Sequence, residues 1–197
     1  MVTPTLTLPI DSGEIRLRAL VEVDFADHAR LFRQPDVVRY LYDGVLKGEQ
    51  LRAHFDKRLW TGLPVEGEWA NLAVVMGNQF LGEIGFGISD AAHRTCEVGY
   101  VFLPEFGGRG FATHATRSAV QLCFEALDAH RVIARLDARN EKSAALVKRL
   151  GFRQEAHYVE NEYVKGEWTD EVVYAILDRE WHSSQHLPAT KTSSRDD

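Results

Sequence analysis

The sequence predicts a single domain of mixed α/β (α+β) class, with a mostly antiparallel twisted sheet flanked by helices. Strict alternation of apolar and polar residues over 14–20 predicts a half-buried strand at the start of the fold. Two apolar runs rich in β-forming residues, 69–76 and 80–88, surround a Gly-Asn turn and predict a hairpin. A strand over 95–103 then leads through a glycine-rich loop into a segment with the apolar spacing of a helix.

The remaining elements follow from local signals. Asp24 is expected to cap a helix that Pro35 stops, and a second amphipathic segment runs from 47 to 60. Further along we expect a strand over 132–138, a helix over 141–150 closed by Gly151, and a hairpin within 158–177 that turns at Lys165-Gly166.

The chain is expected to have one folded domain. Residues 1–13 are predicted to be an N-terminal extension, 14–182 the domain, and 183–197 a polar tail without order. No internal repeat, linker or composition shift indicates a second domain.

The composition excludes several classes of protein. The net charge of −6, from 23 Lys+Arg and 29 Asp+Glu without a basic cluster, argues against a nucleic-acid partner. No run of about 18 apolar residues and no basic leader occurs, which argues against export and a membrane partner. Cys96 and Cys123 are too few for a disulfide framework or a thiolate metal site, so a reducing cytoplasm is the expected location. The histidines, among them His28 and His54, lack metal-ligand spacing; we expect them on the surface or on helix faces, and expect no metal.

Residues 107–113 form a candidate anion site. Free N–H groups at the start of a helix carry the positive end of its dipole, and glycines let an anion approach the backbone closely. Arg109 adds a cation and Thr113 a hydroxyl donor, so pyrophosphate is the expected guest, with a simple chain reversal as the alternative. The loop lacks the Lys-Ser/Thr pair of ATP and GTP sites and the glycine spacing of the dinucleotide fingerprint.

Two sequence motifs, one after the other along the chain, resemble those of a known family. Residues 97–100, 104–105 and 108–115 resemble motif A of the GNAT acyltransferases, in the form of the ribosomal-protein N-terminal (Rim-type) acetyltransferase branch. Residues 140–146 with 150–152 are similar to the second motif of that branch, at the expected distance. The resemblance covers nearly all of residues 14–180, and it implies a GNAT-like fold whose sheet is splayed at its centre.

The resemblance implies acetyl-CoA (coenzyme A) as the co-substrate. Its pyrophosphate would lie on Gly108, Arg109, Gly110, Phe111, Ala112 and Thr113. A backbone N–H near Phe102 or Leu103 would polarise the thioester carbonyl, and Asn140 would bind the pantetheine amide or cap a helix. Gly107 stands where the family commonly has Gln or Arg, so we expect binding of altered strength.

An amine that attacks the thioester directly is protonated at neutral pH, so a base must remove a proton. Glu97 is the favoured base and Glu83 the second; the structural alternative is an exposed strand carboxylate or one paired with an arginine such as Arg94. Val147 occupies the place where many family members have a tyrosine that protonates the leaving thiolate. Ser143 is the substitute, or merely a hydroxyl that caps its helix.

The acceptor is expected to be a primary amine, and the branch resemblance favours a protein N-terminal α-amine. A small-molecule amine (polyamine, amino acid or antibiotic) is the alternative within the enzyme class, and a non-catalytic acyl-CoA-binding module is the alternative outside it. Some aromatic residues are candidates for an acceptor pocket or for core and rim packing: Tyr42, Trp60, Trp69 and Trp168. A homodimer is left open.

Overall fold

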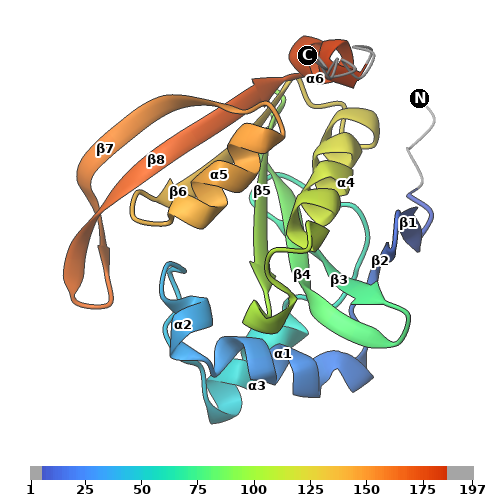
Figure 1. The fold of residues 1–197 in the computed structure, drawn as a ribbon, viewed down its shortest axis with the longest axis vertical. Coiled ribbons are helices and arrows are strands. Elements are labelled where there is room, and N and C mark those ends of the chain that lie inside the picture. Colours follow the sequence, from blue (N-terminus) through green and yellow to red (C-terminus); the bar gives the residue numbers. More distant parts are fainter. Residues whose placement is uncertain (1–5, 186–197) are drawn as a thin grey trace, which may run out of the picture.

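The computed structural model describes residues 6–185, which form one sheet with helices on both faces (Figure 1). The strands are β1 (Ile10–Ser12), β2 (Ile15–Ala19), β3 (Trp69–Met76), β4 (Gln79–Asp90), β5 (Thr95–Phe102), β6 (Arg131–Asp137), β7 (Arg153–Val164) and β8 (Glu167–Leu177). The helices are η1 (Glu22–Asp24), α1 (Phe25–Phe32), α2 (Pro35–Val38), α3 (Gly48–Asp56), η2 (Pro104–Phe106), α4 (Phe111–Glu125), α5 (Glu141–Arg149) and α6 (Asp178–Gln185). The mixed α+β class is confirmed.

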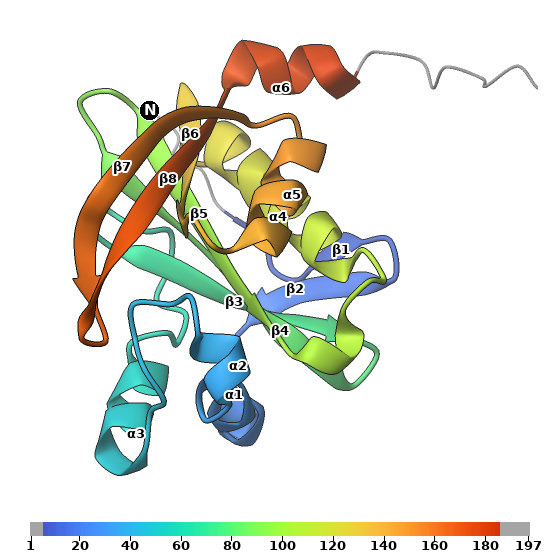
Figure 2. The ribbon, with the colours of Figure 1, turned by 60° about the vertical axis from the view of Figure 1, so that its left-hand side comes forward.

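The sheet is divided at one junction. Its strand order is β1-β2-β3-β4-β5-β6-β8-β7, and neighbouring strands are antiparallel except for β5 and β6. This parallel junction has only three residue pairs, from Thr95 opposite Arg131 to Glu97 opposite Ile133. Beyond Glu97, β5 continues beside β4 alone, and the β7–β8 hairpin leans away from β3 and β4 (Figure 2). The predicted splay is therefore present.

Alternation along the strands gives the sheet two apolar faces. One face packs on α4, where the small residues Ala115 and Ala119 let the helix approach β4 and β5 closely. The other face packs on α1 and α3 through Phe32 and Phe55, both almost fully buried. Each such side chain contributes about 1.5–3 kcal/mol by burial, so the half-sheet β1–β5 is clamped between helices.

Some local predictions were wrong in detail. Asp24 stands at the predicted N-cap position of α1, but its carboxylate makes no capping hydrogen bond to that helix. It accepts instead from Arg18, at 2.6 and 2.7 Å, and from Val21 N–H, at 2.9 Å. Pro35 does more than stop a helix, since it occupies the first turn of α2. The helix expected over 47–60 is shorter and ends at Asp56.

The two ends of the described chain join the fold. Ile10–Ser12, within the expected extension, pairs with β2 as the edge strand. Helix α6 reaches Gln185, so it includes the first residues of the expected tail; residues 186–197 lie outside the described part. None of the described helices has the length and apolar character needed to cross a membrane.

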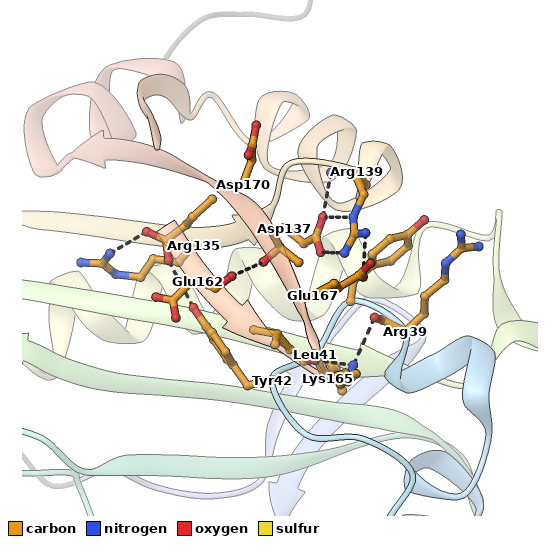
Figure 3. A pocket seen from close by; sticks show the side chains of 14 residues that line it. Arg39, Leu41, Tyr42, Arg135, Asp137, Arg139, Glu162, Lys165, Glu167 and Asp170 are labelled. Carbon is orange, nitrogen blue, oxygen red and sulfur yellow. Dashed lines mark hydrogen bonds and ion pairs between the residues drawn. The ribbon is translucent and has the colours of Figure 1, made fainter. Parts of the chain in front are cut away.

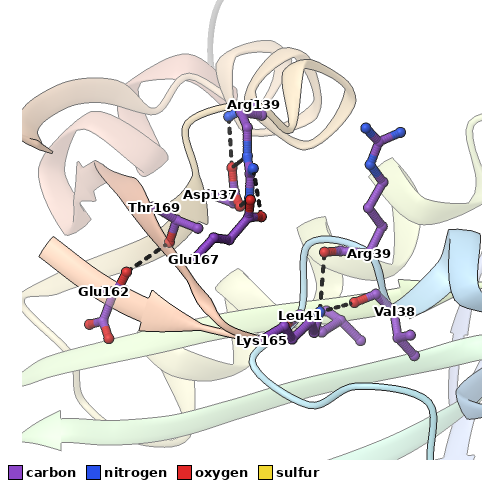
Figure 4. A network of polar contacts seen from close by, with 9 residues as sticks. All are labelled: Val38, Arg39, Leu41, Asp137, Arg139, Glu162, Lys165, Glu167 and Thr169. Carbon is purple, nitrogen blue, oxygen red and sulfur yellow. Dashed lines mark hydrogen bonds and ion pairs between the residues drawn. The ribbon is translucent and has the colours of Figure 1, made fainter. Parts of the chain in front are cut away.

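The tip of the β7–β8 hairpin is fastened to the segment that follows α2. The predicted turn at Lys165-Gly166 is confirmed, and Lys165 Nζ donates hydrogen bonds to the carbonyl oxygens of Val38, Arg39 and Leu41, at 2.6, 3.1 and 2.6 Å (Figure 4). An ammonium group suits the carbonyl end of a helix. This lysine clasp joins the separated second half of the sheet to the helices under the first half.

Replacing Lys165 by Met should loosen the clasp. Charge-assisted bonds of this kind contribute about 1 kcal/mol or more at a partly exposed site, so backbone hydrogen exchange over 38–43 should quicken roughly fivefold. Lys142→Met, an exposed lysine on α5, is the matched control. Unchanged exchange over 38–43 in Lys165→Met would show that the hairpin is held by other contacts.

Candidate active site

The unpaired edge of β5 offers backbone groups to a ligand. Leu103 N–H donates to the Leu81 carbonyl at 2.9 Å, so it points toward β4. Because successive N–H groups of a strand point to opposite sides, those of Phe102 and Tyr100 point to the open edge. Of the two donors expected from the sequence, Phe102 is therefore free to serve at this edge, while Leu103 is committed to β4.

The glycine loop forms a hollow at the end of this edge. Gly108 and Gly110 have φ values of +78° and +82°, the left-handed conformation that favours glycine. Gly110 precedes α4 directly, and no side chain caps the first N–H groups of that helix, at 111–113. The hollow, called here the glycine-loop hollow, is lined by Phe102, Phe106, Gly107, Gly108, Gly110, Phe111, Ala112, Thr113, Leu146 and Arg149. Its uncapped N–H groups and positive dipole fit a pyrophosphate.

Two arginines lie near this hollow in different ways. The Arg109 guanidinium lies 4.5 Å from the centre of the Phe111 ring, and Arg109 does not line the hollow. Arg149, in the last turn of α5, does line it and has no ion pair within residues 6–183. The sequence did not single out Arg149, because only the fold brings the end of α5 opposite the loop.

The two candidate carboxylates lie on the face of the sheet opposite α4. Strand pairing places Trp69, Gly87 and Glu97 in one row across β3, β4 and β5, and Ala73, Glu83 and Val101 in another. Directly paired residues share a face. Glu83 and Glu97 are four residues of strand apart, roughly 13 Å, so they cannot work as a pair on one proton.

Glu97 stands at the junction where β6 departs. Its carboxylate lies 3.6 Å from Arg135 Nε, and its side chain keeps one-fifth of its surface exposed. Burial raises the pKa of Glu97 above its ordinary value, a shift that Arg135 opposes and Glu171 reinforces. Arg94, the partner considered from the sequence, pairs with Asp128 at 2.6 Å instead. Glu97 is thus a partly accessible carboxylate with a raised proton affinity.

A second, polar hollow lies beside Glu97, between the segment after α2 and the β7–β8 hairpin. Tyr42 donates to Glu171 at 3.2 Å, and Arg135 donates to the other oxygen of the same carboxylate at 3.0 Å. Figure 3 shows Tyr42, Arg135 and Glu162 around this hairpin hollow. It is lined by Arg39, Tyr40, Leu41, Tyr42, Arg135, Asp137, Arg139, Glu162, Val164, Lys165, Glu167, Thr169, Asp170 and Glu171.

Charges in the hairpin hollow are mostly paired. Asp137 and Glu167 both accept from Arg139, whereas Glu162 has no cationic partner within residues 6–183. Burial and the neighbouring carboxylates raise the pKa of Tyr42 to about 12, so its hydroxyl stays protonated. The hollow therefore keeps an unneutralised carboxylate close to a hydrogen-bonding phenol.

Glu83 lies in a buried polar cluster under α1 and α3. It accepts from His28 Nδ1 at 2.6 Å, and His28 Nε2 meets His54 Nδ1 at 3.0 Å. Arg58 Nε lies 3.5 Å from the other Glu83 oxygen. His28 is on a helix face, as expected for the histidines, but that face is fully buried. Burial lowers the pKa of His54 to about 3, which keeps it neutral. These contacts indicate that Glu83 stabilises the buried cluster and is not exposed to act as a base.

The start of α5 brings together the other predicted residues. Asn140 Oδ1 accepts from Ser143 N–H at 3.1 Å and so caps the helix, leaving the amide NH₂ available to a ligand. The sequence analysis missed Tyr100, whose hydroxyl donates to the Ser143 carbonyl at 3.2 Å and whose pKa burial raises to about 12. Val147 is fully buried. Tyr100 therefore ties β5 to α5 across the splay and fixes the position of Ser143.

The remaining aromatic candidates have different surroundings. Trp60 packs partly buried against the core, and the exposed Trp168 pairs with Tyr163 at the hairpin. Trp69 is half-exposed on the face that carries Glu97. In the described part of the chain, His, Cys, Asp and Glu side chains form no group that could hold a metal ion.

Comparisons with known proteins agree with this geometry. The acetyltransferase (GNAT) domain family matches residues 14–153. The uncharacterized N-acetyltransferase YnaD of Bacillus subtilis (strain 168) is 28% identical over 167 residues, covering 82% of this chain and 94% of that protein. The putative ribosomal N-acetyltransferase YdaF of the same organism is 38% identical over 96 residues, covering 49% and 52%.

A solved structure is also similar. The spermidine N-acetyltransferase from Vibrio cholerae in complex with CoA and spermine has a TM-score of 0.74 and 22% identity, over 86% of this chain and 99% of that one. At this identity the likeness concerns the fold.

Replacing Gly110 by Val should weaken coenzyme A binding at least tenfold, about 1.4 kcal/mol, by calorimetry. The branched side chain is strained at the positive φ of Gly110, a residue that lines the glycine-loop hollow. Gly166→Val is the matched control, because it has a φ of +89° and lies in the hairpin turn. Equal affinity for coenzyme A in folded Gly110→Val and wild-type protein would remove the loop from the cofactor site.

Arg149→Gln should also weaken coenzyme A binding, and more than Arg109→Ala does, because Arg149 lines the glycine-loop hollow and Arg109 does not.

Proposed function

Because the chain belongs to the GNAT acetyltransferase family, we propose that it transfers an acetyl group from acetyl-CoA to a protein N-terminal α-amine by direct attack on the thioester. The observation that carries this proposal is that the splay leaves one edge of β5 open, with Glu97 at the junction where the edge begins and the glycine-loop hollow where it ends. The family membership indicates an acyl-CoA-dependent N-acetyltransferase and not a non-catalytic binding module.

The residues around the splay fit coenzyme A. We assign the pyrophosphate to the uncapped N–H groups of 111–113 and to Gly108 and Gly110, with charge from Arg109 and Arg149. Phe102 N–H at the open edge would stabilise negative charge that develops on the carbonyl oxygen. When bound, acetyl-CoA supplies an acetyl group activated as a thioester.

Glu97 is assigned as the base, with Glu83 as the second choice. An α-amine has a pKa near ~8 and is mostly protonated at neutral pH, so a base must take a proton before or during attack. The raised pKa of Glu97 increases its proton affinity, while Arg135 keeps the carboxylate ionised enough to accept. Glu83 is enclosed by His28 and Arg58 and is poorly placed to meet a substrate.

Ser143 is assigned to the leaving thiolate. Its backbone is held on both sides, since its N–H donates to Asn140 and its carbonyl accepts from Tyr100. Its hydroxyl has no hydrogen-bond partner within the described residues and is free to donate to sulfur. Asn140 would bind the pantetheine chain through its amide NH₂.

The connection between the segment after α2 and the β7–β8 hairpin restricts access to the hairpin hollow, and this favours an acceptor that presents a chain end. The Lys165 clasp and the Tyr42–Glu171 hydrogen bond join the segment after α2 to the hairpin. An amine in the middle of a folded surface would collide with this connection, whereas an N-terminus or a small molecule can enter. The similarity to a putative ribosomal N-acetyltransferase supports the N-terminal choice.

A polyamine is the second candidate, because Glu162 has no cationic partner among the described side chains, and Glu97 and Glu171 share one arginine. The fold likeness to a spermidine N-acetyltransferase is consistent with it.

We extend the proposal to the location and bounds of the enzyme. Cys96 and Cys123 are both buried and free, which fits a cytoplasmic location. Residues 14–182 are proposed to be the transferase domain.

Thiol release from acetyl-CoA should require an added amine and should be fastest with short peptides that carry a free α-amine. Mass spectrometry should place the acetyl group on that amine. If kcat/KM for spermidine is at least tenfold higher than for every peptide, the polyamine candidate replaces the N-terminal amine as the acceptor. No release with any amine would contradict both.

Glu97→Gln should lower kcat at least a hundredfold and leave coenzyme A affinity nearly unchanged, because the amide cannot accept the proton. Wild-type activity should fall as the pH drops through the pKa of Glu97, since the acid form is not a base; burial places this loss above the ordinary glutamate range. Glu83→Gln is the matched comparison. A larger loss of kcat in Glu83→Gln than in Glu97→Gln would reverse the assignment.

A further inference from the structure

Part of the sheet face around Glu97 carries no side chains. Strand pairing places Gly85 beside Gly99 in one row and Gly87 beside Glu97 in the next. Three glycines on neighbouring positions of β4 and β5 leave a bare patch of backbone next to the proposed base. Such a patch in the middle of a sheet gives up side-chain packing, so something else must occupy the space.

The indole of Trp69 occupies that space. A Cβ atom on Gly85 would lie 3.0 Å from Trp69 Cε3 and 2.9 Å from Asn71 Oδ1, both closer than a real Cβ atom tolerates comfortably. A Cβ atom on Gly99 would lie 3.5 Å from the same ring, at ordinary contact. The ring therefore extends from β3 across β4 to the strand that borders the splay, and glycine at 85 is what lets it lie there.

The indole of Trp69 fills the space over the glycines and also presents an exposed face. Trp69 keeps 44% of its surface exposed, although its lower side covers backbone. Several aromatic rings of the protein have a cation over them, including Tyr40, Phe111 and Tyr174; within residues 6–183 the indole of Trp69 has none. An open indole face attracts cations and apolar chains.

The charges near this face have one sign in excess. Glu97 stands in the same row as Trp69, with its Cα about 10 Å away across two strand spacings. Glu97 and Glu171 share Arg135, and Glu162 adds a carboxylate that has no cationic partner in the described part of the chain. The surroundings of the indole therefore favour a positive or neutral group over a negative one.

We propose that Trp69 is a specificity-determining residue whose exposed indole face binds the aliphatic or cationic segment next to the reacting amine of the acceptor. This inference rests on the proposed function, because it needs an amine to be delivered to Glu97. Two sources share the required chemistry: the first side chain of a peptide N-terminus, when it is apolar or basic, and the methylene chain of a polyamine. An acidic first residue would meet the carboxylates and lose the contact.

The test compares kcat and KM of wild-type protein, Trp69→Phe and Trp69→Leu on spermidine and on short peptides that begin with Leu, Lys or Glu. Wild-type kcat/KM should be at least tenfold higher for the Leu and Lys peptides than for the Glu peptide. Trp69→Leu should raise KM for the favoured acceptors roughly five- to tenfold, with kcat within twofold and unchanged coenzyme A affinity. The KM of Trp69→Phe should lie between those of wild-type protein and Trp69→Leu. The acceptor class that binds to the indole, spermidine or the peptides, is the one whose KM should rise more in Trp69→Leu.

Two further variants separate recognition from packing. Tyr163→Leu, at an exposed aromatic residue of the hairpin that does not line the hairpin hollow, should leave both kinetic constants unchanged. Gly85→Ala should displace the indole and reproduce the KM rise of Trp69→Leu, whereas Gly99→Ala should have a smaller effect. Wild-type preference retained in both Trp69 variants would overturn the inference while the transferase function stands. Absence of acetylation by wild-type protein would instead overturn the proposed function.

Discussion

The structure depends on the early end of one strand pairing. Strands β5 and β6 pair over three residues and then separate, so the β5 backbone from about residue 98 onward has hydrogen-bonding groups without a strand partner. Unpaired backbone groups inside a sheet are costly unless a ligand or water satisfies them. The splay thus creates a site that an extended amide-bearing chain such as pantetheine can fill, and the glycine loop lies where the strand ends.

An open junction has to be held at a fixed width. The half-sheet β1–β5 is packed between α4 and the α1–α3 helices, while β6–β8 is attached to it by a few specific contacts. Tyr100 to the start of α5, Tyr42 to Glu171 and the Lys165 clasp each span the opening. These polar links fix the geometry without filling the space. The same arrangement leaves Glu97 partly buried beside Arg135 and Glu171, and this burial raises the pKa of Glu97 above its ordinary value.

Local sequence signals predicted local structure well. The glycine loop, with left-handed Gly108 and Gly110 before α4, and the turn at Lys165-Gly166 are set by residues that few alternatives can replace. The splay came from the family resemblance. Contacts between distant residues were not predictable: Arg149 faces the loop from another helix, Tyr42 reaches Glu171 from 129 residues away, and His28 is drawn from an amphipathic helix into a pair with Glu83. Asp24 occupies the predicted N-cap position of α1, but Arg18 on the preceding strand takes its carboxylate, so the side chain does not cap that helix. The assignment of base, thiolate donor and acceptor remains a proposal derived from position and chemistry.

We propose that coenzyme A binds along the unpaired edge of β5. Hydrogen exchange of backbone amides, measured with and without saturating coenzyme A, tests it most directly. We expect coenzyme A to slow exchange strongly over 98–102 and over 108–115, with little change in β2 and β3. Slowing confined to other elements, or normal exchange over 98–102 under saturating coenzyme A, would contradict it.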